Sequence, residues 1–286
     1  DCASLAGNAT KITARGFGWT HAGRSEPALS DIDVVIEPGE RVLLCGDSGS
    51  GKSTLLAAMA GVLGSDEEGT RTGELLLEDS SGLVEEPGRT IPVGLVLQDP
   101  DSQVISARVG DDIAFGCENL AYPREEIWRR VAAAKELVGP FVDLDFRTER
   151  LSGGQKQRLA LAGVIAMGAG VVLLDEPTAN LDPAGARDVV RAVARLVEET
   201  GATLVVVEHQ HAAWDGVLDR AVELDRGRIV ADTSFAEVAQ RRQVSGLPQA
   251  RRLSEAELAQ RDAALWSTDL VLSLIHISEP TRLRRI

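Results

Sequence analysis

The sequence is poor in cysteine and in basic residues relative to acidic ones, and both shortages exclude classes of protein. Its three cysteines, Cys2, Cys45 and Cys117, show no CxxC spacing and have no histidine nearby. Neither a structural zinc site nor a disulfide framework is therefore expected, and reduced thiols are the simplest interpretation. The formal net charge is −14. Because a duplex-binding protein usually carries a basic face, we expect no nucleic acid partner.

Long hydrophobic runs are also missing. The longest uncharged stretch, residues 159–174, is interrupted by glycines and falls short of the roughly 20 residues that a membrane-spanning helix needs. We interpret it as a buried helix followed by a buried strand. The chain begins with Asp1 and not with methionine, so the N-terminus, and any targeting signal in it, is expected to be missing.

Short apolar runs separated by helical stretches predict an α/β fold. Runs rich in leucine and β-branched residues are typical of parallel strands that are buried on both faces. Residues 10–40 and 73–77 instead carry short strand-like patches with a turn at Pro38-Gly39, which predicts a small antiparallel β layer. The predicted parallel strands are RVLLC (41–45), VGLVL (93–97), VVLL (171–174) and TLVVVE (203–208).

Two of the predicted helices have recognisable starts. Pro123 suits a first helical turn, and Asp182-Pro183 places an N-cap acid before a proline at the first helical position. In both segments apolar residues recur at helical spacing and form one buried stripe. The predicted inward positions are Ile127, Val131, Ala134 and Val138 in the first helix, and Val189, Val193, Leu196 and Val197 in the second.

A phosphate-binding loop is predicted at GDSGSGKS (46–53), which fits G-x-x-x-x-G-K-[ST] between a strand and a helix. The glycines let backbone N–H groups surround a β-phosphate. Lys52 brings a positive charge to the β and γ oxygens, and Ser53 offers a hydroxyl to Mg²⁺. The nucleotide-binding residues predicted here are Gly46, Asp47, Ser48, Gly49, Ser50, Gly51, Lys52, Ser53 and Thr54.

An acid pair, Asp175-Glu176, ends the apolar strand 171–174. Carboxylates directly after a buried strand are costly unless a cation or a water-activating task uses them. The alternative is a solvated strand end that Pro177 terminates. In the functional interpretation, Asp175 holds Mg²⁺ through water and Ser53, and Glu176 orients or deprotonates the attacking water.

Gln98 and His209 follow two other predicted strands. Ligands of parallel α/β sheets bind beyond the carboxyl ends of the strands, so polar residues at these ends are expected to converge. Gln98 would contact Mg²⁺ and the water, and His209 the γ-phosphate. The predicted catalytic residues are Glu176, His209, Gln98 and Lys52, and the predicted metal ligands are Ser53, Gln98 and Asp175.

Two further features point to a nucleotide. LSGGQKQR (151–158) places Ser152 and two glycines ahead of a helical run, which is a second anion-binding pattern. Trp19, in the predicted β layer, could stack on an adenine ring, with Phe17 as the alternative stacking residue. A position in the hydrophobic core is nearly as plausible for Trp19.

In this order, GDSGSGKST, Gln98, LSGGQKQR, VVLLDEP, ANLD and EH at 208–209 resemble the ATP-binding cassette (ABC) ATPases over residues 10–240. Within that family, QDPDSQ (98–103), DDIAFGCENL (111–120) and VVEHQ (206–210) are similar to the energy-coupling-factor importers of vitamins and of cobalt or nickel. The resemblance implies a P-loop NTPase with a parallel sheet core, an N-terminal antiparallel β layer and an inserted α-helical subdomain at about residues 104–168.

The resemblance also implies a role in trans for LSGGQ. In this family two cassettes associate head to tail, and the signature of one closes on the γ-phosphate held by the other. The implied ligands are ATP and Mg²⁺. The implied partners are a second ABC ATPase domain, as a homodimer, a heterodimer or the other half of a tandem chain, and a transmembrane energy-coupling subunit at the cytoplasmic face of the membrane. The nucleotide contacts implied at the seam are Ser152, Gly153, Gly154, Gln155 and Asp182.

Two other function classes fit the sequence less well. A soluble cassette that acts on nucleic acid or ribosomes would be expected to carry a basic or coiled-coil insertion between Gln98 and Ser152, and none is visible. A P-loop kinase or switch would leave LSGGQ and the Glu176–His209 pair without a role.

The C-terminal part has a different character. Residues 241–271 read as a polar linker, and ALWSTDLV (264–271) resembles the first strand of a second cassette. LSLIHISEPTR (272–282) matches the in-frame translation of a transposase adapter used in sequencing libraries. We interpret residues 272–286 as an artefact, exclude them from the fold, and expect the natural gene to continue beyond Val271.

Overall fold

The computed structural model describes residues 9–63, 68–139, 142–209 and 211–238, and these residues form two sheets of different kinds. The strands are β1 (Lys11–His21), β2 (Leu29–Ile36), β3 (Arg41–Gly46), β4 (Gly69–Glu78), β5 (Val84–Glu85), β6 (Val93–Val96), β7 (Val171–Asp175), β8 (Thr203–Val207), β9 (Arg220–Asp225) and β10 (Arg228–Ser234). A six-stranded sheet has the order β10-β9-β3-β8-β7-β6, in which only the β9–β10 pair is antiparallel. A four-stranded antiparallel sheet has the order β2-β1-β4-β5. Both predicted sheets are confirmed.

The strands β9 and β10 were not anticipated from the sequence. They form a hairpin whose turn contains Arg226 and Gly227, with φ of 45° and 75°. Two consecutive positive φ values are typical of the tight turns whose twist suits a hairpin. Strand β9 pairs in parallel with β3 and so extends the sheet beyond the four predicted strands.

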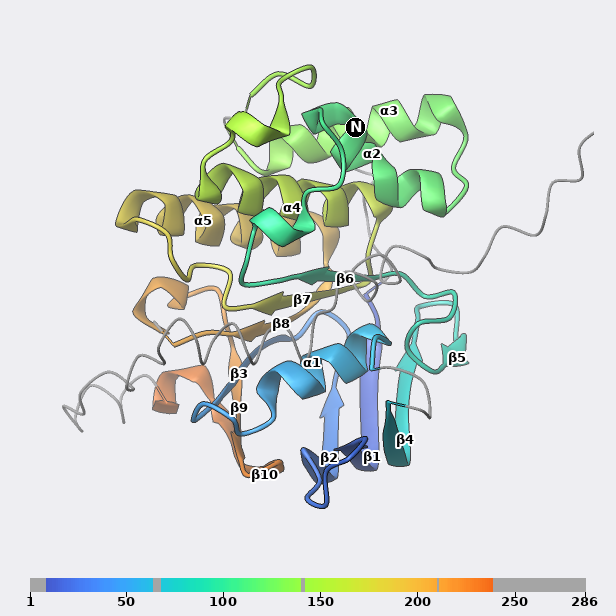
Figure 1. The fold of residues 1–286 in the computed structure, drawn as a ribbon, viewed down its shortest axis with the longest axis vertical. Coiled ribbons are helices and arrows are strands. Elements are labelled where there is room, and N and C mark those ends of the chain that lie inside the picture. Colours follow the sequence, from blue (N-terminus) through green and yellow to red (C-terminus); the bar gives the residue numbers. More distant parts are fainter. Residues whose placement is uncertain (1–8, 64–67, 140–141, 210, 239–286) are drawn as a thin grey trace, which may run out of the picture.

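Within the described ranges, five α-helices cover the six-stranded sheet and build a separate helical layer (Figure 1). Alternate residues of the central strands face two hydrophobic clusters. Leu43, Val172 and Leu204 belong to the cluster that contains α2 to α5, whereas Leu44 and Leu173 belong to the cluster that contains α1 and the antiparallel sheet. The helices are α1 (Lys52–Ala60), α2 (Val109–Asn119), α3 (Arg124–Leu137), α4 (Gly153–Met167) and α5 (Pro183–Thr200).

Of the two predicted helix starts, that of α5 is as predicted, whereas α3 begins one residue later than predicted. Asp182 caps α5 by accepting a hydrogen bond from the Gly185 amide at 2.6 Å, and Pro183 is the first helical residue, as predicted. Pro123 is the N-cap of α3 and lies just outside its first turn. All eight predicted inward positions of these two segments are buried.

The uncharged stretch 159–174 is the end of α4 followed by β7, as predicted, with Gly168 closing the helix in a left-handed conformation (φ 74°). The proposed linker and the adapter-like segment, residues 241–286, lie outside the described residues. Within the ranges that the structure describes, no helix combines the length and the apolar character needed to cross a bilayer.

Candidate active site

The polar residues predicted to act together do lie at one edge of the parallel sheet. Asp175 is the last residue of β7, while Gln98 and His209 each lie two residues beyond the end of β6 and β8. The loop that leads to Lys52 begins where β3 ends. These four strands are neighbours in the order β3-β8-β7-β6 and run parallel, so their carboxyl ends share one edge.

The phosphate loop between β3 and α1 contains two glycines that a larger residue could replace only with backbone strain. Gly46 and Gly51 have φ of 139° and 104°. A Cβ added at Gly46 would lie 2.1 Å from the carbonyl oxygen of Leu224, and one at Gly51 would lie 2.8 Å from that of Ala28. The first turn of α1 leaves amide groups without partners inside the helix, which is the arrangement that binds phosphate oxygens.

Lys52 is folded over its own loop. Its Nζ atom donates to the carbonyl oxygens of Gly46, at 3.0 Å, and Asp47, at 2.8 Å, and the residue is 6% exposed. The outer side of the loop, at Ser48 and Gly49, is exposed to solvent. A lysine held this way is positioned as a point charge at the rim of the loop, where phosphate oxygens would compete with the two carbonyls.

Glu176 and His209 are in direct contact. The Oε1 atom of Glu176 lies 3.1 Å from Nε2 of His209, and their side chains are 13% and 40% exposed. Glu176 adopts φ of 48°, an unfavourable conformation for a non-glycine residue, while its amide donates to the carbonyl of Val207 at 2.9 Å. Backbone strain that the surrounding structure maintains is common at active sites.

Glu208 fixes the position of His209, and sequence reasoning assigned it no role. Its Oε1 atom accepts a hydrogen bond from the His209 amide at 2.8 Å, and its Oε2 atom accepts one from the Thr178 hydroxyl at 2.5 Å. Both Glu208 and Thr178 are buried. The segments that follow β7 and β8 are therefore joined behind the Glu176–His209 contact.

The backbone beside Gln98 is held by two other glutamines. The amide side chain of Gln103 donates to the carbonyl of Leu97 at 3.1 Å and accepts from its N–H at 2.9 Å. The Nε2 atom of Gln157, a fully buried residue of α4, donates to the carbonyls of Leu97 at 3.0 Å and Gln98 at 3.4 Å. Gln157 was assigned no role from the sequence. The one sequence feature that could have indicated its role is its position within LSGGQKQR (151–158).

The LSGGQ segment forms the exposed N-terminus of α4. Ser152 and Gln155 make a reciprocal capping box, with the Ser152 amide donating to Oε1 of Gln155 at 2.8 Å and the Gln155 amide donating to the Ser152 hydroxyl at 3.4 Å. The spacing S-x-x-Q is a known sequence signature of this motif. A Cβ on Gly154 would lie 3.5 Å from Cα of Gly185, so the segment adjoins the start of α5, which Asp182 caps.

The two candidate stacking aromatics are both buried. Trp19 is 5% exposed and Phe17 is 2% exposed. The indole Nε1 of Trp19 donates to Nδ1 of His21 at 3.2 Å. Burial, and secondarily the charge of Arg24, lowers the pKa of His21, which favours the neutral acceptor form. Neither ring lies open on the surface, and stacking of Trp19 on adenine stays a prediction.

The predicted magnesium ligands suit an ion that binds only a few protein groups and fills its remaining positions with waters and phosphate oxygens. Ser53, Gln98 and Asp175 supply one hydroxyl, one amide and one buried carboxylate. Nowhere in the described ranges do three or more His, Cys, Asp or Glu side chains gather as a metal cluster. Mg²⁺ is typically held by one or two protein carboxylates together with waters and substrate phosphates, so the residues present fit it.

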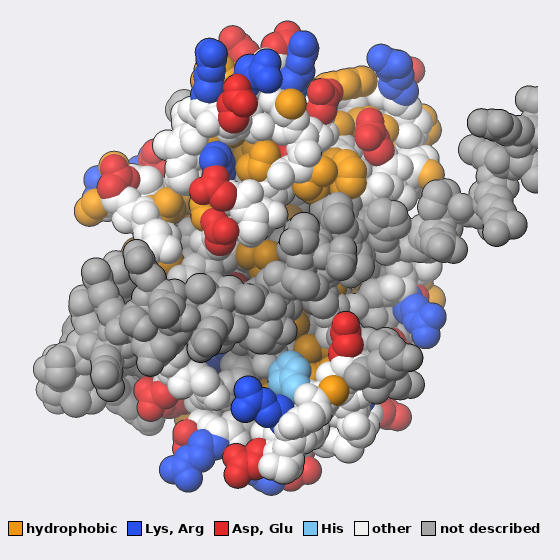
Figure 2. Space-filling model, in the orientation of Figure 1, with side chains coloured by type: hydrophobic (Ala, Val, Ile, Leu, Met, Phe, Trp, Pro, Cys, Tyr) orange, Lys and Arg blue, Asp and Glu red, His pale blue; other side chains and the backbone are white. Residues whose placement is uncertain are grey.

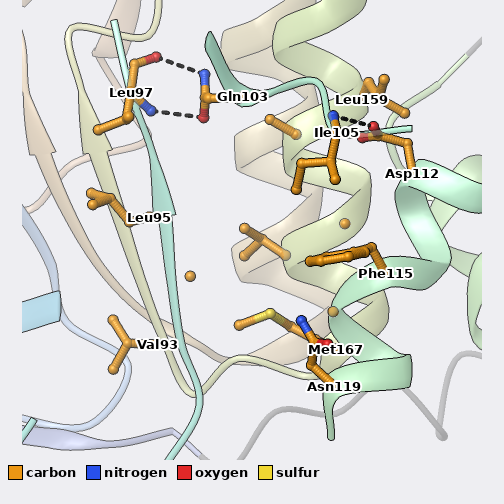
Figure 3. Close-up of a pocket in the computed structure, with 15 residues that line it drawn as sticks. Val93, Leu95, Leu97, Gln103, Ile105, Asp112, Phe115, Asn119, Leu159 and Met167 are labelled. Atoms are coloured by element: carbon orange, nitrogen blue, oxygen red, sulfur yellow. Dashed lines mark hydrogen bonds between the residues drawn. The ribbon is translucent and has the colours of Figure 1, made fainter. Parts of the chain in front are cut away.

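An apolar groove opens beside Gln98, between β6 on one side and α2 and α4 on the other (Figure 3). Leu95 and Leu97 line the strand side, and Phe115 from α2 and Met167 from α4 face them. Asp112 stands at one end, where its carboxylate accepts from the amides of Ile105 and Ser106, each at 2.8 Å. Burial raises the pKa of Asp112. In the space-filling view, hydrophobic side chains are visible over α2, below charged ones at the helical end of the molecule (Figure 2).

Comparison with known proteins agrees with this geometry. The profile of the ABC transporter family matches residues 29–179. A putative ABC transporter ATP-binding protein of Methanosarcina acetivorans is 38% identical over 78% of this chain but only 35% of its own length. The energy-coupling factor transporter ATP-binding protein EcfA1 of Caldanaerobacter subterraneus is 39% identical over 75% of this chain and 76% of its own.

A solved structure gives the same result for the fold. The chain superposes on cbiO1 of Clostridium perfringens, described as part of the ABC transporter complex cbiONQ, with a TM-score of 0.67 and 27% identity. The alignment covers 91% of this chain and 97% of the other. The chain spans little more than a third of the Methanosarcina relative. Motifs, fold and relatives together place the chain in the ABC transporter family, as one of its ATPase cassettes.

Proposed function

We propose that this cassette hydrolyses ATP to power the import of a micronutrient, a vitamin or a transition-metal ion, through a separate transmembrane partner. The observation that carries the proposal is the arrangement at the sheet edge. The phosphate loop, Gln98, Asp175 and the Glu176–His209 contact follow four adjacent parallel strands.

In this proposal each residue has one task. Lys52 moves from its two loop carbonyls to the β and γ oxygens of ATP. Glu176 accepts the proton of the attacking water, and His209, held by Glu208, contacts the γ-phosphate. Ser53, Gln98 and Asp175 would hold Mg²⁺, which supplies positive charge to the phosphate oxygens.

A second cassette would complete the site. Ser152 and Gly153 are exposed at the N-terminus of α4, where free amides and the helix dipole favour an anion. The proposal assigns Ser152, Gly153, Gly154 and Gln155 to the γ-phosphate of the partner cassette, with Asp182 at the same interface. That partner cassette is a copy of this chain, a different subunit or the other half of a tandem protein.

The transmembrane partner would dock in the apolar groove of Figure 3, at the cytoplasmic face of the membrane. The groove is continuous with the nucleotide site because Leu97 lines it and directly precedes Gln98. Gln103 and Gln157 hydrogen-bond to the backbone of Leu97. A movement of Gln98 toward the nucleotide would therefore shift Leu97, which lines the groove. The names of the EcfA1 and cbiO1 relatives support a partner of the energy-coupling type.

The test is co-purification of the complete protein with the transmembrane subunit encoded beside its gene. Ile105→Asp places a charge in the groove at a residue that is 39% exposed, and it should abolish the association while basal ATPase activity is retained. Val230→Asp, at a 57% exposed position on β10, is the matched control and should bind normally. Binding unaffected by Ile105→Asp would contradict the docking site. ATPase activity that no membrane subunit associates with or modulates would contradict the transport function.

A further inference from the structure

Strand β1 carries three aromatic rings near its end, and they differ in how deeply they are buried. Phe17 and Trp19 are 2% and 5% exposed and belong to the hydrophobic cluster that contains α1. His21, the last residue of the strand, is partly exposed. Trp19 and His21 lie two residues apart in a stretch that pairs regularly with β4, so their side chains lie on the same face of β1. The ring of His21 is therefore on the α1 side of the strand, at the margin of the core.

Backbone hydrogen bonds hold this end of β1 beside the phosphate loop. The amide of Ala28, just before β2, donates to the carbonyl of Trp19 at 2.8 Å. Gly227 lies between β2 and the loop, because its carbonyl accepts from the Ser30 amide at 2.8 Å and its amide donates to the Ser50 carbonyl at 2.9 Å. A nucleotide whose phosphates bind the loop can therefore place its base against the end of β1.

The contacts of Trp19 make it a support for His21. A Cβ at Gly69, which pairs with His21, would lie 2.2 Å from Cζ2 of Trp19, so the indole fills the space of a missing side chain. Its Nε1 atom donates to Nδ1 of His21 at 3.2 Å, and the two rings meet edge to face at 85°. An indole N–H can only donate, so Nδ1 accepts and the proton of the neutral imidazole lies on Nε2. The lowered pKa of His21, caused first by burial and then by Arg24, favours this neutral form.

We propose that His21, and not Trp19, stacks on the adenine of ATP, with Trp19 as the positioning residue that fixes the His21 ring. The inference rests on the proposed ATPase function, because it concerns the base of the same nucleotide. Histidine is one of the flat side chains on which nucleic acid bases stack. The hydrogen bond from Trp19 fixes the ring before the nucleotide binds, so less conformational freedom is lost on binding.

The test compares the binding of ADP and of inorganic tripolyphosphate to the complete protein, by calorimetry in the presence of Mg²⁺. Tripolyphosphate has no base and reports on the phosphate loop alone. His21→Ala should weaken ADP binding by about fivefold or more and leave tripolyphosphate binding unchanged. His21→Phe retains a flat ring and should recover part of the loss. Thr20→Ala alters a side chain on the other face of β1, and as the matched control it should bind both ligands normally.

A double-variant cycle tests the positioning role of Trp19. Trp19→Phe keeps a buried aromatic ring but removes the N–H donor, so it should weaken ADP binding by less than His21→Ala does. Combined with His21→Ala it should cause no further loss, because the hydrogen bond that it removes is already absent. Circular dichroism melting checks that the variants are folded.

The outcomes separate this assignment from the proposed function. Unchanged or tighter ADP binding by His21→Ala would overturn the assignment and return the stacking role to Trp19. Equal losses of ADP and tripolyphosphate binding would also overturn it, because they would show a disturbed phosphate loop and not a lost stacking contact. An unaltered protein that binds neither ligand would contradict the proposed ATPase function itself, and the assignment with it.

Discussion

Glu176 is fixed by three separate constraints. Its φ of 48° turns the chain sharply after β7, its amide continues the β7–β8 pairing through Val207, and its carboxylate meets His209 at 3.1 Å. A side chain fixed in this way loses little conformational entropy when it meets a reacting water.

Replacement of this carboxylate isolates its chemical role. Glu176→Gln keeps the size of the side chain but removes the base, so ATP binding should survive while turnover falls by about 10²-fold or more. Nucleotide affinity and steady-state hydrolysis measure the two effects. Glu199→Gln, at an exposed position of α5, is the control and should be unchanged. Near-normal turnover of Glu176→Gln would refute its assignment as the base.

The candidate residues that the sequence indicated and those that it did not differ in where their partners lie along the chain. Lys52 and Glu176 lie in motifs whose spacing along the chain is enough to propose a role, so the sequence alone could single them out as candidates. Gln157 and Thr178 act through a backbone carbonyl and a buried carboxylate supplied by distant segments. No local pattern records such partners, because tertiary packing brings them together. The burial of Trp19 was likewise left open by the sequence.

The Thr178–Glu208 hydrogen bond offers a matched pair of substitutions. Thr178→Val removes a donor to a buried carboxylate and should lower the free energy of unfolding by about 1–3 kcal/mol, and ATPase activity should fall because Glu208 positions His209. Thr233→Val removes a buried hydroxyl that has no hydrogen bond among the described residues, so it should be nearly neutral. Urea unfolding distinguishes the two. Equal stability losses would show that the Thr178 bond contributes nothing specific.

At the scale of elements, α4 is tied to β6 and to the segment after it. Gly94 of β6 lies directly beneath Val164 of α4, and Gln157 donates to the backbone after the strand. An ion pair between Lys156 and Asp101 adds a contact at the exposed end. The helical layer therefore meets the sheet through a small number of specific contacts at this edge, in addition to apolar packing.

Two glycines test how tightly these elements pack. A Cβ at Gly94 would lie 2.2 Å from a methyl group of Val164, so Gly94→Ala should cost about 1–3 kcal/mol through overpacking. Gly163 in α4 has no atom within 4 Å of its Cβ position, and Gly163→Ala should stabilise by about 0.5–1 kcal/mol. Denaturant midpoints report both changes. A neutral Gly94→Ala would mean that β6 and α4 can separate without cost.

The elements that the sequence predicted well are those with long periodic patterns. The stripe of α5 and the apolar runs of β7 and β8 gave clear signals because one environment covers each of them along its length. The β9–β10 hairpin was missed because β10 alternates between partly buried and exposed residues and contains few apolar side chains. Its turn, Arg226-Gly227, was the only local signal.

At the scale of the whole molecule, the phosphate loop and the LSGGQ segment are proposed as two half-sites, and complementation can test whether they act in trans. Lys52→Ala and Ser152→Arg chains should each be inactive alone. A mixed dimer contains one composite site with an intact phosphate loop and an intact LSGGQ segment, so part of the ATPase activity should return. Lys52→Ala mixed with the Lys52→Ala/Ser152→Arg double variant contains no such site and is the control. No recovery at any ratio, although mixed dimers form, would contradict action in trans.

The two hydrophobic clusters share the central strands, since alternate residues of the same five-residue strands, β7 and β8, face one cluster and then the other. If either hydrophobic cluster unfolds, one face of β7 and β8 becomes exposed to solvent, and these same strands also support the other cluster. Amide hydrogens of β7 and β8 should therefore exchange only through global unfolding, whereas those of β10, at the sheet edge, should exchange through local opening. Because the two hydrophobic clusters share these strands, the helical layer and the sheets should unfold in a single cooperative event.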